Sequence, residues 1–329
     1  MSRKENARLK GERVMKKYSI AFLVLIGWAY AAGSAAAQPF RDGAALSTEK
    51  TVPVTIVVSV GAKHGTQVPK IYKEDVMVFQ GGNRVKVTDW RPIREKRPEL
   101  ELFVLIDDAC DTSAGLQLDD LRGFIKSQSD TTFVGVGYIR NSSVQIAQNL
   151  TRDHEQAAHA LRIPFGSSAT DSSPYLALTS LVEGWPASEN QRAIFLVSPG
   201  IDGLQPGPSN SYLEEAINHA RRANIEVYAI YAFPSGRLGR NLWRMNFGQS
   251  NLSQLGDETG GDAFFQGFQT PLSFKPFLQE FGDRLKHEYS LTFLANAGDE
   301  PKDHRIRLET EVTNAELTGP GMVRVPAAK

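Results

Sequence analysis

The chain has 329 residues, 41% of them apolar, and its 37 lysines and arginines are balanced by 37 aspartates and glutamates. This length suits one large domain or two ordinary ones, and the apolar content is sufficient for a hydrophobic core. The zero net charge gives no electrostatic reason to expect a nucleic acid or an anionic membrane surface as a partner.

The N-terminus has the pattern of an export signal. Lys16 and Lys17 precede an apolar stretch and then small residues that end in three consecutive alanines. We therefore predict a signal peptide over residues 1–37 and a mature chain that is periplasmic or secreted. The single cysteine, Cys110, excludes an intrachain disulfide in that oxidising compartment and also a thiolate metal site.

Two alternatives stay open in this segment. The apolar stretch is shorter than the roughly 20 residues that a membrane-spanning helix needs, which favours cleavage, but an uncleaved segment would anchor the protein in a membrane. Met15 stands just before the two lysines and is an alternative start to Met1. In either case, residues 38–50 are predicted to be a polar linker before the fold begins.

Strand-like stretches follow the linker. Residues 51–60 (TVPVTIVVSV) are rich in β-branched side chains and nearly continuous in their apolar character. Residues 76–79 and 85–90 flank the turn Gly81-Gly82-Asn83, which is typical of a β-hairpin. These stretches predict a small N-terminal β unit over residues 51–97.

The pattern changes after residue 97. Apolar strands now alternate with amphipathic helices, and the strands lack the alternation of a half-exposed sheet. This combination predicts an α/β domain over residues 98–287, with a doubly wound, mostly parallel sheet and helices on both faces. The expected strands are residues 102–106, 133–139, 193–197 and 225–231, and the expected helices lie within 116–128, 153–163, 172–185 and 211–224.

After residue 287 the sequence again has a strand pattern. EYSLTFLAN and HRIRLETEV alternate apolar and polar residues, and GMVRVP is a candidate last strand. We expect residues 288–329 to pack with the N-terminal β unit as one small β-sandwich, with the α/β domain inserted between the two halves. Two separate β extensions are the alternative.

Three aspartates at the end of the most apolar strand form the candidate site. Asp107, Asp108 and Asp111 follow this strand at its carboxyl end, where open parallel sheets bind ligands. Three carboxylates within five residues can hold a hard divalent cation through oxygen. The structural interpretation is that Asp107 or Asp108 caps the following helix, and the two roles are compatible.

Several stretches resemble, in order, von Willebrand factor type A domains, and more closely an exported bacterial subgroup related to them. KHGTQVPKIYKEDVMVFQGGNRVKVTDW resembles the leader of that subgroup, FVLIDDACD its first strand with the metal loop, and ANIEVYAIYAF a later strand. LSQLGDETGGDAFF resembles the segment with a Thr-Gly-Gly turn, and RLKHEYSLTFLAN the helix and strand that close the domain. The resemblance covers nearly all the mature chain and implies a von Willebrand factor A-like fold.

The resemblance also implies a metal-ion-dependent adhesion site, and the sequence departs from its pattern. The motif D-x-S-x-S has Asp107 at its acid but Ala109 and Asp111 at its two serine positions. Thr170 matches the threonine of the second loop, and SPGIDG offers Asp202 in place of the last acid. Loss of one hydroxyl ligand and gain of one charge make a bound ion less able to recruit a partner's carboxylate, so we expect a degenerate, metal-free site.

We therefore expect a non-enzymatic, exported interaction module without a cofactor, which binds an unknown protein of the cell envelope or extracellular space. The residues predicted to bind it are Asp107, Asp108, Asp111, Thr112, Thr170, Ser172 (a competitor for the threonine position) and Asp202. One alternative is a Mg²⁺- or Mn²⁺-dependent binding domain with Asp107, Asp111 and Thr170 as metal ligands. A more remote alternative is a hydrolase with Cys110 as the nucleophile, which the acids beside it oppose by raising the pKa of the thiol.

Residues 233–251 combine three arginines with Trp243 and Phe247. An exposed set of tryptophan and arginine suits a protein contact surface. A packed lid over the sheet is equally compatible with this composition, and the sequence does not separate the two interpretations.

Overall fold

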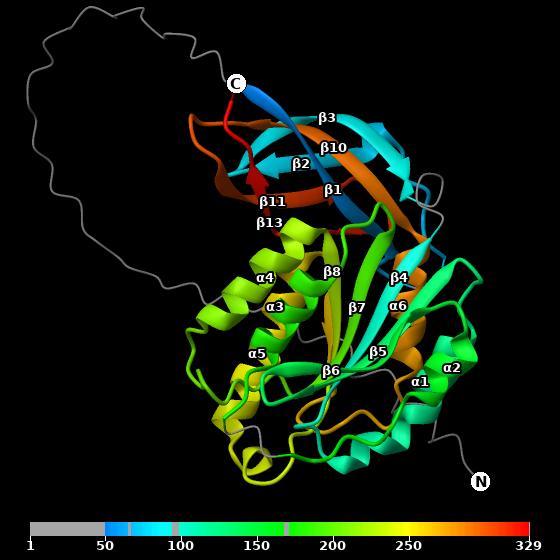
Figure 1. The fold of residues 1–329 in the computed structure, drawn as a ribbon. Helices are drawn as coiled ribbons and strands as arrows, with labels where there is room; N and C mark the ends of the chain where they lie inside the picture. Colours follow the sequence, from blue (N-terminus) through cyan, green and yellow to red (C-terminus); the bar gives the residue numbers. More distant parts are fainter. Residues whose placement is uncertain (1–49, 65–66, 94–98, 168–170, 329) are drawn as a thin grey trace, which may run out of the picture. The chain divides into compact units, whose positions relative to one another are not determined.

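Two β-sheets organise the part of the chain that the computed structural model describes, residues 50–64, 67–93, 99–167 and 171–328 (Figure 1). One sheet has seven antiparallel strands, and the other has six strands that are mostly parallel. The predicted signal peptide, nearly all of the predicted linker and Thr170 lie outside the described residues. Within these residues, no helix is long and apolar enough to cross a membrane.

The six-stranded sheet has the spatial order β6-β5-β4-β7-β8-β9. All neighbouring strands are parallel except β6, which is antiparallel to β5. The order reverses between β4 and β7, the position at which open α/β sheets bind ligands. The strands are β4 (Leu100–Asp107), β5 (Thr132–Arg140), β6 (Ser143–Thr151), β7 (Gln191–Ser198), β8 (Ile225–Tyr231) and β9 (Asp262–Phe264).

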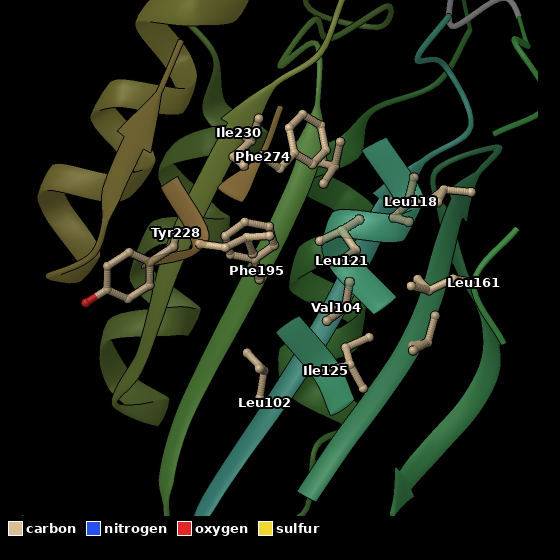
Figure 2. Packing of buried hydrophobic residues seen from close by; sticks show 14 of the residues in the cluster. Leu102, Val104, Leu118, Leu121, Ile125, Leu161, Phe195, Tyr228, Ile230 and Phe274 are labelled. Atoms are coloured by element: carbon tan, nitrogen blue, oxygen red, sulfur yellow. The ribbon is translucent and has the colours of Figure 1, made fainter. Parts of the chain in front are cut away.

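Alternate residues of β4 belong to two different apolar clusters. Leu102, Val104 and Ile106 pack with residues of α1, α2 and α6, as Figure 2 shows for part of this cluster. Phe103 and Leu105 pack with residues of α3, α4 and α5. The helices are α1 (Leu118–Lys126), α2 (His154–His159), α3 (Pro174–Gly184), α4 (Ser211–Ala223), α5 (Leu242–Thr259) and α6 (Lys275–Lys286).

The parallel arrangement of the four predicted apolar strands is confirmed. Leu102 to Ile106 are all at most 4% exposed, which explains why β4 lacks polar alternation: both of its faces are covered. Strand β6 was not predicted from the sequence. It is a partly exposed edge strand, SVQIAQNLT, whose polar residues weaken the strand pattern.

The seven-stranded sheet joins both ends of the described chain around one apolar core. Strand β1 pairs with β10 from Thr51↔Asn296 to Ser59↔Glu288, and β2 pairs with β11. The strands of the two ends therefore pair in a single hydrogen-bonded order β12-β1-β10-β3-β2-β11-β13, where we expected a sandwich. The strands are β1 (Thr51–Ala62), β2 (Val76–Gln80), β3 (Asn83–Pro92), β10 (Glu288–Asn296), β11 (Lys302–Thr310), β12 (Ala315–Thr318) and β13 (Met322–Val325).

Candidate functional site

Asp107 is the last residue of β4 and lies beside the end of β7, at the reversal of strand order. Its carboxylate is 4% exposed and accepts two hydrogen bonds, from Ser198 Oγ at 2.8 Å and from the Ala109 amide at 2.9 Å. Burial raises the pKa of Asp107 to about 6, these two hydrogen bonds oppose the rise, and Asp108 adds to it. Both carboxylate oxygens are therefore already engaged inside the protein.

Asp108 binds an arginine and is 1% exposed. Its two oxygens accept from Arg162 Nη1 at 2.7 Å and Nη2 at 2.8 Å, and Oδ1 also accepts from the Phe165 amide at 3.1 Å. The guanidinium lies 3.6 Å from the centre of the Tyr138 ring and 3.8 Å from that of Phe165. Asp108 thus holds the segment after α2 in place, and its side chain is not available to a ligand.

Asp111 is the capping residue of this loop, not Asp107 or Asp108 as the sequence suggested. It precedes the short 3₁₀ helix η3 (Thr112–Gln117), and its Oδ1 accepts from the Ser113 amide at 2.9 Å. Hydrogen bonds from the side chain of Ser113 and then from its amide lower the pKa of Asp111. The chain makes a turn over residues 107–110 before the helix starts, so only Asp111 is close enough to the free amides. Thr112 is exposed at the start of η3.

Asp202 connects the loop after β7 to two helix N-termini. It is 2% exposed and accepts from Ser173 Oγ at 2.6 Å and from Asn210 Nδ2 at 3.1 Å, and these two residues are the N-caps of α3 and α4. Its other oxygen accepts from the amides of Leu204 at 2.8 Å and Gln205 at 2.9 Å. Because these four donors occupy both of its oxygens, the Asp202 carboxylate has a structural role.

Ser172 accepts a hydrogen bond from the Ser142 amide at 2.9 Å, in the turn between β5 and β6. The adjacent Ser173 caps α3, and the sequence contained a signal for it, because it directly precedes Pro174 at the first helical position. Thr170 cannot be placed, since it lies outside the described residues.

The segment 233–251 covers the loop that follows β7. A Cβ added to Gly248 of α5 would lie 2.2 Å from the Pro199 carbonyl, and one on Gly200 would lie 2.3 Å from the Gly248 carbonyl. Gly200 also has φ +65, a conformation that favours glycine. Backbone therefore packs directly on backbone, and Met245 joins the small cluster around Ala109. The inner face of this segment is therefore packed on the loop, as the lid interpretation expects. Its outer face is exposed, with Leu242 60% and Trp243 75% exposed.

Cys110 is fully buried, and its Sγ donates to the Val197 carbonyl at 3.6 Å. Burial raises the pKa of the thiol well above its usual value, and the three neighbouring aspartates add to the rise. A buried, protonated thiol is a poor nucleophile, so this geometry does not favour the hydrolase alternative.

The acids that the sequence offers as ligands for a hard divalent cation accept hydrogen bonds within the protein. Such an ion takes six or more oxygen ligands, whereas Asp107, Asp111 and Asp202 all direct oxygens to donors of the protein itself. Among the residues that the structure describes, no three histidine, cysteine or acidic side chains are placed to hold a metal ion.

No family model and no curated protein matches the chain. Among solved structures, it is similar to an aerotolerance-related membrane protein from Bacteroides fragilis, with 12% identity and a TM-score of 0.38, over 56% of this chain and 98% of that one. It is also similar to BatB from Bacteroides thetaiotaomicron, with 14% identity and a TM-score of 0.31, over 41% and 67% of the two chains. A third is the human COPII-coat protein Sec24c, with 10% identity and a TM-score of 0.40, over 70% and 44%.

Proposed function

We propose that the chain is an exported, non-enzymatic interaction module with a doubly wound, von Willebrand factor A-like domain. The strand order and the two apolar clusters, which together contain residues of all six α-helices, support this fold. The binding face is the carboxyl edge of the six-stranded sheet together with the outer face of residues 233–251, and the ligand is a protein of the envelope or the extracellular space.

The observation that supports this function is that buried acids and exposed apolar side chains lie on different parts of the carboxyl edge. Asp107 and Asp202 are buried and bonded inside the protein, and Asp111 caps a short helix, while Leu242 and Trp243 are exposed beside each other on the covering segment. Trp is among the side chains that dominate binding energy in protein interfaces. The degenerate site thus has a structural role, and the contact surface lies over it.

We expect titration of the mature chain with millimolar Mg²⁺ or Mn²⁺ to give no saturable heat in calorimetry. The reason is that a cation at Asp107 would have to displace the hydrogen bonds from Ser198 and Ala109. A 1:1 isotherm that disappears in Asp107→Asn would contradict the metal-free proposal and favour the cation-dependent alternative.

Trp243→Ala is expected to weaken partner binding by about 30-fold, the effect of losing a central tryptophan worth roughly 2 kcal/mol. The measurement is chemical crosslinking of the mature chain in the native envelope, identification of the captured protein, and titration of that purified protein. Stability should change little, because the Trp243 side chain is 75% exposed.

Tyr72→Ala is the matched control, because Tyr72 is an aromatic residue that is 54% exposed and lies outside the proposed face. This variant should bind as the wild type does. Equal loss in both variants, or full binding by Trp243→Ala, would refute the assignment of the face.

A further inference from the structure

The outer face of residues 237–247 combines apolar and basic groups. Leu242 and Trp243 stand at the first turn of α5, and the ring of Trp243 lies 6.2 Å from that of Phe247. Arg237 and Arg240 are exposed, and Arg244 is half-buried. We call these six residues the arginine–tryptophan surface.

This surface is held rigidly from beneath. Met245 is 3% exposed, and Gly248 approaches the Pro199 carbonyl so closely that a Cβ there would lie 2.2 Å from it. Leu252, one turn further along α5, is fully buried. The exposed side chains therefore project from an anchored helix, which reduces the conformational entropy that binding would cost.

The charge of the surface is not compensated locally. Residues 233–256 contain three arginines and no aspartate or glutamate. In the described ranges, these guanidinium groups form no ion pair within 4.0 Å. Asp202 lines the same small hollow as Arg244, but it is 2% exposed and accepts four hydrogen bonds from other groups.

We propose that the arginine–tryptophan surface binds an acidic peptide segment that contains a large apolar side chain. This inference rests on the proposed function, because the segment would belong to the partner protein. Carboxylates of the peptide would pair with the arginines, which bind them in a bidentate geometry, and its apolar side chain would pack on Trp243 and Phe247.

The local confinement of the positive charge favours a peptide over an anionic membrane. Arg244 and Phe247 line only a small hollow of about 10 Å³ beside the loop with Gln205 and Pro206, so the surface is nearly flat there. Arg237, Arg240 and Arg244 lie within eight residues of one another, a length that a short acidic segment can span, whereas the chain as a whole has no net positive charge to attract it to a bilayer. Exposed tryptophan and arginine also occur at membrane interfaces, so vesicle binding is an outcome that the test must distinguish.

The test is a selection of random twelve-residue peptides on the mature chain, followed by fluorescence anisotropy with the enriched peptides. We expect enriched peptides to be net negative and to contain a large apolar residue. Their affinity should fall roughly tenfold or more in the triple charge-reversal variant and also at higher salt. That variant is R237E/R240E/R244E.

The control is a triple reversal of exposed basic residues on the seven-stranded sheet, R84E/K86E/R305E, which changes the net charge by the same amount. It should bind the enriched peptides as the wild type does. Both variants should keep the wild-type thermal midpoint. Replacing the peptide's acids by lysine should abolish binding to the wild type and restore it to the reversed surface.

Each of three outcomes would overturn the inference. The selection could enrich no peptides, it could enrich peptides without an excess of acidic residues, or the enriched peptides could bind the R237E/R240E/R244E variant as tightly as the wild type. Binding to phosphatidylglycerol vesicles without peptide enrichment would overturn it in favour of a lipid surface. If Trp243→Ala still weakens capture of the envelope partner in these cases, the proposed function stands and only the partner's chemistry is wrong. If capture is insensitive to Trp243→Ala, the proposed function itself is wrong.

Discussion

Arg162→Ala is expected to lower the free energy of unfolding by about 3 kcal/mol, because it leaves the Asp108 carboxylate buried without its cation. Asp108 is 1% exposed, and among the described residues the Phe165 amide, at 3.1 Å, is the donor that its carboxylate would keep. The change also removes the stacking of the guanidinium on Tyr138. Urea unfolding monitored by fluorescence measures the loss.

The companion variants separate charge from packing. Asp108→Asn in the Arg162→Ala background should recover part of the lost stability, because the buried group is then neutral. Arg162→Lys should lie between wild type and alanine, since an ammonium cannot reproduce the two-pronged geometry seen at 2.7 and 2.8 Å. A loss below about 1 kcal/mol in Arg162→Ala would show that the buried carboxylate finds another partner or a proton.

Glu226→Gln is expected to remove a marked pH dependence of stability. Glu226 of β8 is 6% exposed and is hydrogen-bonded to Glu288 of β10, which is 2% exposed. Burial raises the pKa of Glu226 to about 7, against the opposing effects of its hydrogen bonds from Glu288 and Tyr228 and the charge of Arg284. Two buried carboxyl groups close together disfavour a state in which both are ionised, since two negative charges there would repel each other.

The direction of the pH dependence of stability follows from the raised pKa of Glu226. The folded protein holds the Glu226 proton more tightly than the unfolded chain, whose glutamates titrate near 4.5. The stabilisation is therefore complete below about pH 4.5 and is lost as the pH rises to about 7, by an amount on the order of 3 kcal/mol. Glutamine cannot ionise, so this slope should disappear in the variant.

The measurement is urea unfolding at intervals from pH 4.5 to pH 8. Glu214→Gln is the matched control, because Glu214 is exposed on α4 and its loss should leave the slope unchanged. If Glu226→Gln retains the wild-type slope, another group is responsible for it.

The elements of this fold follow from local sequence patterns. The apolar run Leu102 to Ile106 predicts a strand covered on both faces, and its end at Asp107 places an acid at the ligand-binding edge of a parallel sheet. The Gly81-Gly82 turn predicts the hairpin, and both glycines have positive φ. Such features were predictable because they depend on residues within a few positions of one another.

The roles of the acids were decided by tertiary structure. Asp107 receives its hydroxyl donor from Ser198, 91 residues away, and Asp108 receives its cation from Arg162, 54 residues away. Nothing in DDACD distinguishes these two neighbouring carboxylates, although the fold turns them toward different partners. Likewise, the raised pKa of the buried Glu226 could not be predicted from the sequence, because it depends on the fold placing β8 near Glu288 of β10.

The sequence by itself thus determined the four apolar strands of the parallel sheet, the hairpin and the edge at which the candidate site lies, because apolar periodicity and turn residues act locally. Only the tertiary structure decided that the acids at this edge are bonded internally and that Trp243 is exposed above them. The physical reason is that hydrogen bonding and burial depend on which distant segments the fold places in contact, and no short-range pattern records those contacts.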